Sequence, residues 1–495
     1  MVDSEEFDVI VVGGGPAGST LSSLVTMKGA RVLLLEREVF PRYQIGESLL
    51  PATVHGVCKM LGVSDQLAEA GFPIKRGGTF RWGSRPDPWT FSFAVSPRVA
   101  SPTSFAYQVE RARFDKILLD NAARLGVDVR QSCNVQDVTE DGDRVNGVRY
   151  VDADGHERTA TARFVVDASG NTGRLHARTG AKREYSEYFR SLALFGYFEG
   201  GKRLPEPTSG NILSVAFDSG WFWYIPLSAT LTSVGAVVHR DMAEKVQGDR
   251  EQALNALIKE CPLISEYLEN ATRVTEGKYG EIRVRKDYSY LNSRFWRPGM
   301  ISIGDAACFV DPVFSSGVHL ATYSALLAAR SINSIMAGTI EEEPALKEFE
   351  GRYRREYGVF YEFLMSFYQM NKDESSYFWE AKRVTHAEQY TEFESFVELV
   401  AGVSSGESAL TNADDLVDRF RERSDELAAA VNNIADGTPG GSSSMLKSAV
   451  VKHAMQEGSQ VQMRALLGED AVQEAPLFPG GLVPALDGMS WERPA

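Results

Sequence analysis

The hydrophobic pattern at the start of the chain predicts a strand, a tight turn and a helix. Residues 7–12 read Phe-Asp-Val-Ile-Val-Val, an apolar run typical of a buried strand. The run passes into Gly-Gly-Gly-Pro-Ala-Gly and then into a helical stretch that ends near Gly29. Gly13 permits a tight turn, Gly15 lets the backbone approach a pyrophosphate, and Gly18 lets the helix pack closely on the strand. We therefore predict a dinucleotide-binding unit in this segment.

A second strand and an acidic residue follow at a suitable spacing. The apolar run from Arg31 to Leu35 ends at Glu36, 18 residues after Gly18. A carboxylate at this point can accept hydrogen bonds from an adenosine ribose. Strand, glycine turn, helix, strand and acid in this order predict that the chain binds FAD or NAD.

Two later strand ends favour FAD. An apolar strand at 164–166 is followed by Asp-Ala-Ser-Gly, and a strand at 300–303 is followed by Gly-Asp-Ala-Ala, which contains Asp305. A helix is expected at about 318–337. An aspartate at the second turn can bind a ribitol hydroxyl, and the helix N-terminus can face the flavin ring and its anions. A plain strand-turn-helix junction is the alternative interpretation.

The interior of the chain predicts a second sheet. Residues 80–105 and 190–275 contain short alternating runs, which are typical of antiparallel strands. The heptad Gly-Trp-Phe-Trp-Tyr-Ile-Pro puts Trp221 and Trp223 on one face of a strand, because alternate side chains share a face, and ends it at Pro226. Taken alone, the heptad also fits an ordinary core strand.

The pattern changes again after residue 338. A helical region rich in aromatic residues follows, and rings spaced three to four residues apart are typical of a helix core. Some of these rings could instead line a substrate entrance. Residues 435–444 have the Gly, Pro and Ser content of a flexible linker, and the Pro- and Gly-rich stretch from residue 474 is expected on the surface.

These segments predict an α/β fold in three parts. A Rossmann-type FAD-binding domain is interleaved with an antiparallel-sheet substrate domain, and a helical C-terminal region follows. The predicted ranges are 1–79, 106–189 and 276–337 for the discontinuous FAD-binding domain, 80–105 and 190–275 for the β-rich substrate domain, and 338–495 for the helical region.

Composition narrows the class of protein. The 495 residues suffice for two or three domains, and 43% hydrophobic with 24% charged residues is typical of a soluble enzyme. No apolar run is long enough to cross a membrane, and the acidic start lacks the basic residues of a signal peptide, so we expect a cytoplasmic protein. The net charge of −15 disfavours nucleic acid and anionic membranes as partners. The four scattered cysteines indicate neither a disulfide framework nor a metal site.

The glycine turn and the two strand ends resemble the FAD-dependent monooxygenase superfamily, and further motifs resemble its flavin-dependent halogenase branch. Gly-Glu-Ser-Leu-Leu-Pro at 46–51 is similar to the flavin-contacting loop of that branch, and residues 108–115 are similar to the helix whose arginine meets FAD. The tryptophan heptad is the mark that separates halogenases from hydroxylases. The resemblance implies FAD contacts at Gly13, Gly15, Gly18, Glu36, Arg42, Gly46, Ser48, Arg111 and Asp305.

A single lysine completes the resemblance. Lys75 lies in Gly-Phe-Pro-Ile-Lys-Arg-Gly-Gly, where the halogenase pattern has its catalytic lysine. A lone lysine is usually solvated, but one that is partly desolvated has a lowered pKa and can meet electrophilic halogen as an ammonium donor or as an amine nucleophile. The resemblance implies that reduced FAD, O2 and chloride or bromide give hypohalous acid, which reaches Lys75 through an internal passage.

The resemblance also assigns a halide seat and a wall. The backbone amides of Ser316 and Gly317 match the family's halide contacts, and amides at a helix start supply partial positive charge. Trp221, Trp223 and Pro226 are expected to wall the flavin side, so that no organic substrate reaches the flavin and is hydroxylated there.

One departure from the tryptophan-halogenating branch concerns the substrate. That branch carries a glutamate where this chain has Phe314, and uses it to assist halogenation of an unactivated indole position. We therefore expect a ring that activates itself, such as a phenol or pyrrole. Residues 40–43 resemble the branch that often acts on carrier-bound rings. A tyrosyl or β-tyrosyl group thioester-bound to a peptidyl carrier protein is the first prediction, and a pyrrolyl group is the second.

Partners and alternatives follow from the same resemblance. The sequence shows no second nucleotide-binding fold for NADPH, so a separate flavin reductase is expected to supply reduced FAD. An acidic carrier protein would need a basic docking face, although ordinary solvated helix charges are the favoured explanation of the candidates. Those candidates are Arg352, Arg354, Arg355, Lys382 and Arg383. The alternative function is an FAD-dependent aromatic hydroxylase, followed by a non-catalytic flavoprotein or a flavin-linked reductase acting on an isoprenoid lipid.

Overall fold

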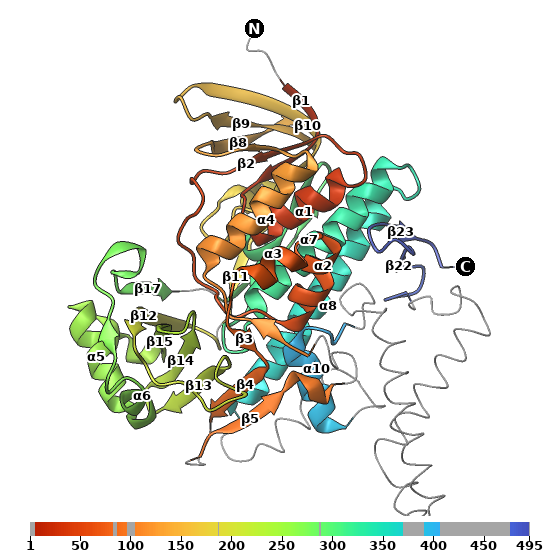
Figure 1. Cartoon of the computed structure of the whole chain (residues 1–495). Helices are drawn as coiled ribbons and strands as arrows, with labels where there is room; N and C mark the ends of the chain where they lie inside the picture. The colour runs from red at the N-terminus through yellow and green to blue at the C-terminus, as the bar shows by residue number, and fades with distance from the viewer. Residues whose placement is uncertain are drawn as a thin grey trace, which may run out of the picture.

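Two eight-stranded sheets organise the chain in the computed structural model (Figure 1). The structure describes residues 5–82, 87–96, 104–186, 188–286, 289–369, 391–405 and 476–494. The predicted linker at 435–444 and the candidate docking residues Lys382 and Arg383 lie outside these ranges.

The first sheet is the doubly wound sheet that the N-terminal pattern predicts. Its strand order is β19-β20-β10-β1-β2-β7, and the four pairs from β20 to β7 are parallel. β8 and β9 extend it as an antiparallel pair attached to β10. The strands are β1 Glu5–Val12, β2 Val32–Leu35, β7 Asp128–Arg130, β8 Asn134–Asp141, β9 Arg144–Val151, β10 Glu157–Asp167, β19 Trp296–Arg297 and β20 Met300–Ser302.

Long helices pack beside this sheet and against one another. α1 (Pro16–Thr26) contacts both α4 (Arg111–Leu125) and α7 (Ser316–Met336), and the three lie together in Figure 1. α7 begins two residues before the predicted helix start and is buried almost throughout, so it forms the centre of the main hydrophobic core. The glycine turn after β1 leads into α1, and the glycine turn after β20 precedes α7. The N-termini of these two helices therefore lie at the same edge of the sheet, as this topology requires.

The second sheet has the order β16-β12-β15-β14-β13-β4-β5, with β17 also paired to β12. All its pairs are antiparallel except β13 with β4. The strands are β4 Gly77–Arg81, β5 Trp89–Ser92, β12 Ser191–Glu199, β13 Ile212–Phe217, β14 Gly220–Pro226, β15 Leu231–His239, β16 Thr272–Arg273 and β17 Arg283–Lys286. β17 and the start of β4 lie outside the predicted ranges of this domain, because two glycines and alternating basic residues gave no strong strand pattern there.

The tryptophan heptad forms β14, and its two faces belong to different cores. Trp221 and Trp223 face the main core, whereas Phe222 and Tyr224 pack in a second core with helix α5. α5 spans Arg250–Glu260 and is followed by α6, Pro262–Tyr267. The predicted alternation is therefore confirmed, and the indole face of β14 points toward the nucleotide-binding part of the fold.

The helical region after residue 338 is partly described. α8 (Glu342–Gln369) and α10 (Glu392–Ala401) bury most of their aromatic rings, as helix-core spacing predicts. Trp491, near the chain end, is also buried, and its Nε1 donates to Ser331 Oγ at 2.9 Å. This segment is therefore anchored on α7 rather than loosely covering the surface.

Further short helices and strands connect these elements. Helices η1, α2 and α3 span Ala52–Val57, Cys58–Met60 and Ser64–Glu69, and the short strands pair as β3 with β6, β11 with β18 and β21, and β22 with β23. Their bounds are β3 Ile74–Lys75, β6 Ala106–Tyr107, β11 Arg183–Tyr185, β18 Tyr290–Asn292, β21 Cys308–Phe309, β22 Val483–Pro484 and β23 Trp491–Glu492.

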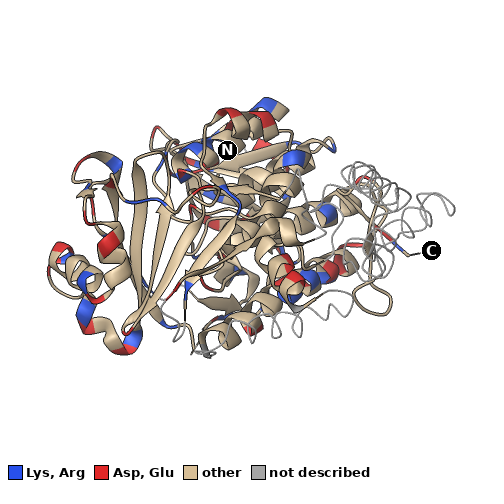
Figure 2. Ribbon diagram, turned by 60° about the horizontal axis from the view of Figure 1, so that its bottom comes forward, with Lys and Arg blue, Asp and Glu red and all other residues tan. Residues whose placement is uncertain are grey.

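Charge is distributed over the outer elements. Lys and Arg are interspersed with Asp and Glu on the helices and loops drawn in Figure 2. Arg352 is buried and bonds Glu348, and Arg354 bonds Glu350, so these two docking candidates already have acidic partners. None of the described helices combines the length and apolar character needed to span a membrane.

Candidate active site

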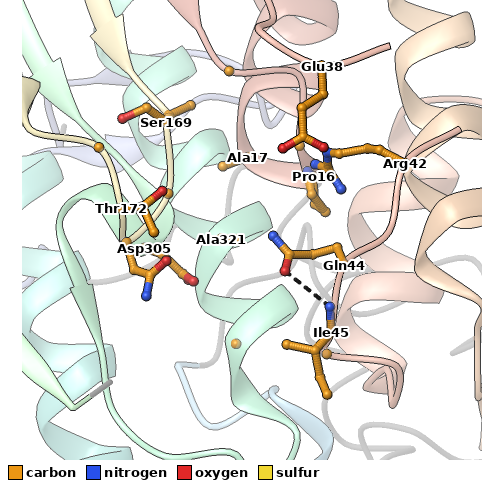
Figure 3. Close-up of a pocket in the computed structure, with 18 of the residues that line it drawn as sticks. Pro16, Ala17, Glu38, Arg42, Gln44, Ile45, Ser169, Thr172, Asp305 and Ala321 are labelled. Atoms are coloured by element: carbon orange, nitrogen blue, oxygen red, sulfur yellow. Dashed lines mark hydrogen bonds between the residues drawn. The ribbon is translucent and has the colours of Figure 1, made fainter. Parts of the chain in front are cut away.

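A cavity of about 510 Å³ lies where the glycine turn, the loop before residue 47 and the start of α7 meet. Figure 3 shows Glu38 and Arg42 on one side of it, with Ser169, Thr172 and Asp305 across from them. Nine of the predicted site residues line the cavity, namely Gly13, Gly15, Glu36, Arg42, Gly46, Arg111, Trp223, Asp305 and Gly317. Because Trp223 is among them, the cavity reaches from the nucleotide-binding sheet to β14.

The glycine turn has the geometry that a close backbone approach requires. Gly13 has φ +108°, and a Cβ at Gly18 would lie 1.9 Å from the carbonyl oxygen of Gly13. α1 starts without a side-chain cap, so its first N–H groups remain available to an anion. Glu36 Oε2 accepts from the Gly14 N–H at 2.7 Å, and this fixes the carboxylate at the cavity wall.

Two arginines at the cavity share one buried carboxylate. Arg111 bonds Asp115 with Nε at 2.7 Å and Nη2 at 2.9 Å, and Arg42 Nη1 bonds the same group at 3.0 Å. Arg111 Nη1 also donates to the Ile45 carbonyl at 2.6 Å, which ties helix α4 to the loop that contains Gly46. Asp115 is fully buried and is a site residue that sequence reasoning missed.

Asp305 lies at the end of the strand that the sequence assigned to the ribitol contact. Burial raises the pKa of its carboxyl, while Arg285, Arg111 and Arg183 act in the opposite direction. The Tyr290 hydroxyl donates to the Asp305 carbonyl at 2.5 Å and so holds the turn in place.

These residues fit FAD. A flavin dinucleotide needs a glycine turn for its pyrophosphate, a carboxylate for each sugar portion and an apolar wall for its ring. The cavity provides the open side of Gly15, the carboxylates of Glu36 and Asp305, and the ring of Trp223. Gly18 and Ser48 do not line the cavity: Gly18 serves helix packing, and the backbone of Ser48 pairs with Gln108.

Lys75 lies inside the protein, away from the cavity lining. It is 3% exposed, and its Nζ donates to the Leu49 carbonyl at 3.0 Å and lies 3.4 Å from Ser315 Oγ. The Phe93 ring lies 5.6 Å from Nζ. Burial lowers the pKa of this lysine to about 7, because the charged form loses its hydration.

The turn before α7 lies between the cavity and the lysine. Ser315 adopts the left-handed conformation with φ 61°, and Ser316 begins the helix with its Oγ on the Asp311 carbonyl at 3.3 Å. Gly317 lines the cavity, whereas Ser315 contacts Lys75. The predicted halide seat therefore joins the two sites within three residues, and Ser315 is a contact that the sequence did not indicate.

The two tryptophans of the heptad lie at different points of this boundary. Trp223 lines the cavity, lies against Gly235, where a Cβ would approach the indole to 2.2 Å, and donates from Nε1 to Ser233 Oγ at 3.1 Å. Trp221 lies behind it, with ring centroids 6.2 Å apart, and contacts Trp82. Pro226 is buried at the end of β14 and does not line the cavity.

Aromatic rings surround the position where a glutamate stands in the tryptophan-halogenating branch. Phe314 contacts Phe80, Phe363 and Phe367 at centroid distances of 5.8, 5.1 and 4.8 Å. A different carboxyl, that of Asp311, lies three residues before Phe314. It is fully buried and accepts a hydrogen bond from the Val313 N–H, and burial raises its pKa to about 7.

The fold and the cavity together define an FAD-dependent oxidoreductase. A family model described as tryptophan halogenase matches residues 8–99 and 94–432. The chain therefore belongs to this family of flavin-dependent halogenases, and the predicted fold class and cofactor FAD are confirmed. The family, rather than the aromatic hydroxylases, is also what the tryptophan heptad indicated.

Individual relatives agree with this assignment. Tryptophan 2-halogenase of Chondromyces crocatus is 33% identical over 384 residues, which cover 77% of this chain and 71% of that protein. A chlorinase of Pseudomonas fluorescens named for 1H-pyrrole-2-carbonyl on a peptidyl carrier protein is 30% identical over 394 residues, 75% of this chain and 85% of that protein. Among solved structures, the myxobacterial chondrochloren halogenase CndH, described as a new variant of FAD-dependent halogenases, has a TM-score of 0.75 and 52% identity, covering 99% of this chain and 100% of that chain.

Proposed function

We propose that the protein halogenates an electron-rich aromatic ring of its substrate, using chloride or bromide, O2 and reduced FAD. Halogen transfer to the ring is proposed to take place beside Lys75. The observation that carries this proposal is the contact of the buried Lys75 with Ser315, because Ser315 belongs to the turn whose Gly317 lines the FAD cavity. When bound, reduced FAD would give two electrons to O2, and the oxygen would take the other two from the halide. The arginines that share Asp115, the glycine turn, Glu36 and Asp305 are the residues that would hold it.

The halide seat is proposed at the backbone amides of Ser316 and Gly317. The first N–H groups of α7 have no side-chain cap, so they offer partial positive charge without an oxidisable group. The Trp223 indole closes the cavity on the opposite sheet and keeps an organic substrate away from the flavin.

Lys75 is proposed to orient the oxidised halogen for transfer. As an ammonium, it donates a hydrogen bond to the oxygen of hypohalous acid, which makes the oxygen a better leaving group. The ring carbon bonds the halogen, the halogen–oxygen bond breaks, the oxygen leaves as water after taking a proton, and the ring proton passes to solvent. A lysine with its pKa near neutrality can give up and regain that proton at the working pH.

We propose a tyrosyl or β-tyrosyl group on a peptidyl carrier protein as the first-choice substrate, and a pyrrolyl group as the second. Phe314, packed among aromatic rings, stands where the tryptophan-halogenating branch has its glutamate, and this supports a phenol or pyrrole. The pyrrole-carrier chlorinase among the relatives supports tethering. Flavin-dependent halogenases need a flavin reductase, and a separate reductase is proposed as the second partner.

Intact mass tests this assignment. The protein is supplied with FAD, NADH, an unrelated flavin reductase, O2 and chloride, together with tyrosyl carrier protein, pyrrolyl carrier protein or free tyrosine. A chlorine-for-hydrogen mass shift on a carrier, absent from free tyrosine, is the expected result. Halogenated free tyrosine would overturn tethering, and an added oxygen in place of chlorine would overturn the proposed chemistry.

A further inference from the structure

A buried carboxyl lies directly behind the loop that lines the cavity. Gly46 belongs to the lining, and the next residue, Glu47, is 2% exposed. The Tyr197 hydroxyl donates to Glu47 Oε1 at 2.8 Å. Glu47 Oε2 is buried and makes no hydrogen bond with any described residue. Burying a carboxyl costs free energy, so its position is best explained by the groups that it binds.

The partners of Glu47 come from the second sheet. Tyr197 on β12 and Ser233 on β15 stand opposite each other in the strand register, so their side chains share one face of the sheet. Burial raises the pKa of Glu47 to about 7, and the hydroxyls of Ser233 and Tyr197 act in the opposite direction. Ser233 Oγ accepts from Trp223 Nε1 at 3.1 Å. One hydroxyl therefore separates Glu47 from the indole that lines the cavity.

The same network returns to the cavity by a second route. The hydroxyls of Tyr197 and Tyr43 lie 2.8 Å apart, and Tyr43 lines the cavity. Tyr279 packs on Tyr197 at a centroid distance of 4.3 Å and closes the group from outside. Glu47 thus connects the cavity loop at 43–46 with two strands of the opposite sheet, and the cavity lies between the connected parts.

We propose that Glu47 is a positioning residue that fixes the Trp223 indole against the flavin cavity by joining the cavity loop to Ser233 and Tyr197. The inference rests on the proposed function in one respect, since the cavity must hold the flavin that oxidises the halide. Without the carboxyl, the Ser233 hydroxyl can rotate. The Trp223 indole, whose Nε1 donates to that hydroxyl, can then move as well. A loosened wall admits water, so more of the O2 reduced by flavin is released as hydrogen peroxide and less of it oxidises the halide for halogenation.

Four variants test the proposal. Glu47→Ala removes the carboxyl, Glu47→Gln keeps an oxygen that can accept from Tyr197, and Ser233→Ala deletes one hydroxyl on the route to the indole. Tyr224→Phe is the matched control. It deletes a buried hydroxyl from β14, the strand that carries Trp223, on the face turned away from the cavity. The measurements are the ratio of halogenated product to peroxide and the visible absorption and fluorescence of bound FAD.

We expect Glu47→Ala and Ser233→Ala to lower the product-to-peroxide ratio by about tenfold and to raise the fluorescence of bound FAD, because the indole no longer lies fixed beside the ring. Glu47→Gln should recover most of the ratio, and Tyr224→Phe should leave both readouts unchanged. An unchanged ratio in Ser233→Ala, or an equal loss in Tyr224→Phe, would overturn the proposal. The fluorescence readout needs no substrate, so a wild-type protein that fails to halogenate the carriers would count against the proposed function while the Glu47 network is still tested.

Discussion

Lys75 and Ser315 stand 240 positions apart in the chain, and the lysine Nζ lies 3.4 Å from the serine Oγ. Ser315 occupies the left-handed region at the start of α7, and two residues later Gly317 lines the FAD cavity. The turn therefore has one end at the cofactor and the other at the buried amine. In the proposed mechanism, this arrangement separates the oxidation of halide at the cavity from halogen transfer at Lys75, while keeping the two steps close together.

The Ser315 hydroxyl can be removed in two ways that differ in backbone strain. Ser315→Gly deletes the hydroxyl and suits the left-handed backbone, whereas Ser315→Ala deletes it and keeps a Cβ at φ 61°. We expect both to lower the rate of halogenation severalfold while FAD binding persists. Ser315→Gly should be the more stable of the two by about 1 kcal/mol in chemical denaturation. Normal halogenation by both variants would show that the hydroxyl does not orient Lys75.

The pH dependence of halogenation should report the charge on Lys75. Its pKa is lowered to about 7, so the ammonium form predominates below neutrality and the amine form above it. If the ammonium orients hypohalous acid, the ratio of halogenated product to oxidised flavin falls as pH rises through about 7. Dividing by oxidised flavin removes the pH dependence of the reductase. A ratio that rises with pH would instead favour the amine as a nucleophile.

The buried lysine should also destabilise the folded protein in a pH-dependent manner. Its folded-state pKa lies below the unfolded value of 10.5, so the unfolded chain binds more protons between about pH 7 and 10.5 and the penalty shrinks as pH rises across that range. Lys75→Met is therefore expected to raise the free energy of unfolding by about 2–4 kcal/mol at pH 6.5, with a much smaller gain near pH 10. Urea titrations at the two pH values measure this. An equal change in the free energy of unfolding at both pH values would show that folding does not lower the pKa of Lys75.

Asp115 should control FAD affinity through the two arginines that it holds. Asp115→Asn removes the negative charge with which Arg42 and Arg111 both form ion pairs. A buried guanidinium without that charge raises the free energy of the folded protein. We expect FAD to dissociate at least about tenfold more readily, which equilibrium titration of flavin fluorescence would detect. Asp120→Asn is the matched control, because Asp120 lies on the same helix and pairs with Lys116 in solvent. If the two variants bind FAD equally, the shared carboxylate does not position the arginines.

The sequence predicted those parts of the site that depend on local pattern. The glycine turn follows from strand and helix periodicity together with the absence of side chains at Gly13 and Gly18. The placement of Trp221 and Trp223 on one face follows from strand alternation, and both indeed face the main core. Each of these features needs only neighbouring residues to specify it.

The contacts that the sequence missed join distant segments. Glu47 and Tyr197 are 150 positions apart, and Lys75 and Ser315 are 240 positions apart. No periodicity encodes such pairs, because they depend on how two sheets dock. Asp115 had a weak local signal, since it stands four residues after Arg111 on a helix, where opposite charges pair. Its second arginine could not be foreseen from that spacing.

The most direct test of the account compares Lys75→Ala with the wild type for halogenated product and hydrogen peroxide, at equal bound FAD and equal supply of reduced flavin. Lys75 lies outside the cavity lining, so its removal should leave FAD binding and peroxide formation intact. The account predicts that Lys75→Ala makes no halogenated product while it consumes O2 at the wild-type rate. Halogenation at an undiminished rate would contradict the assignment of halogen transfer to Lys75.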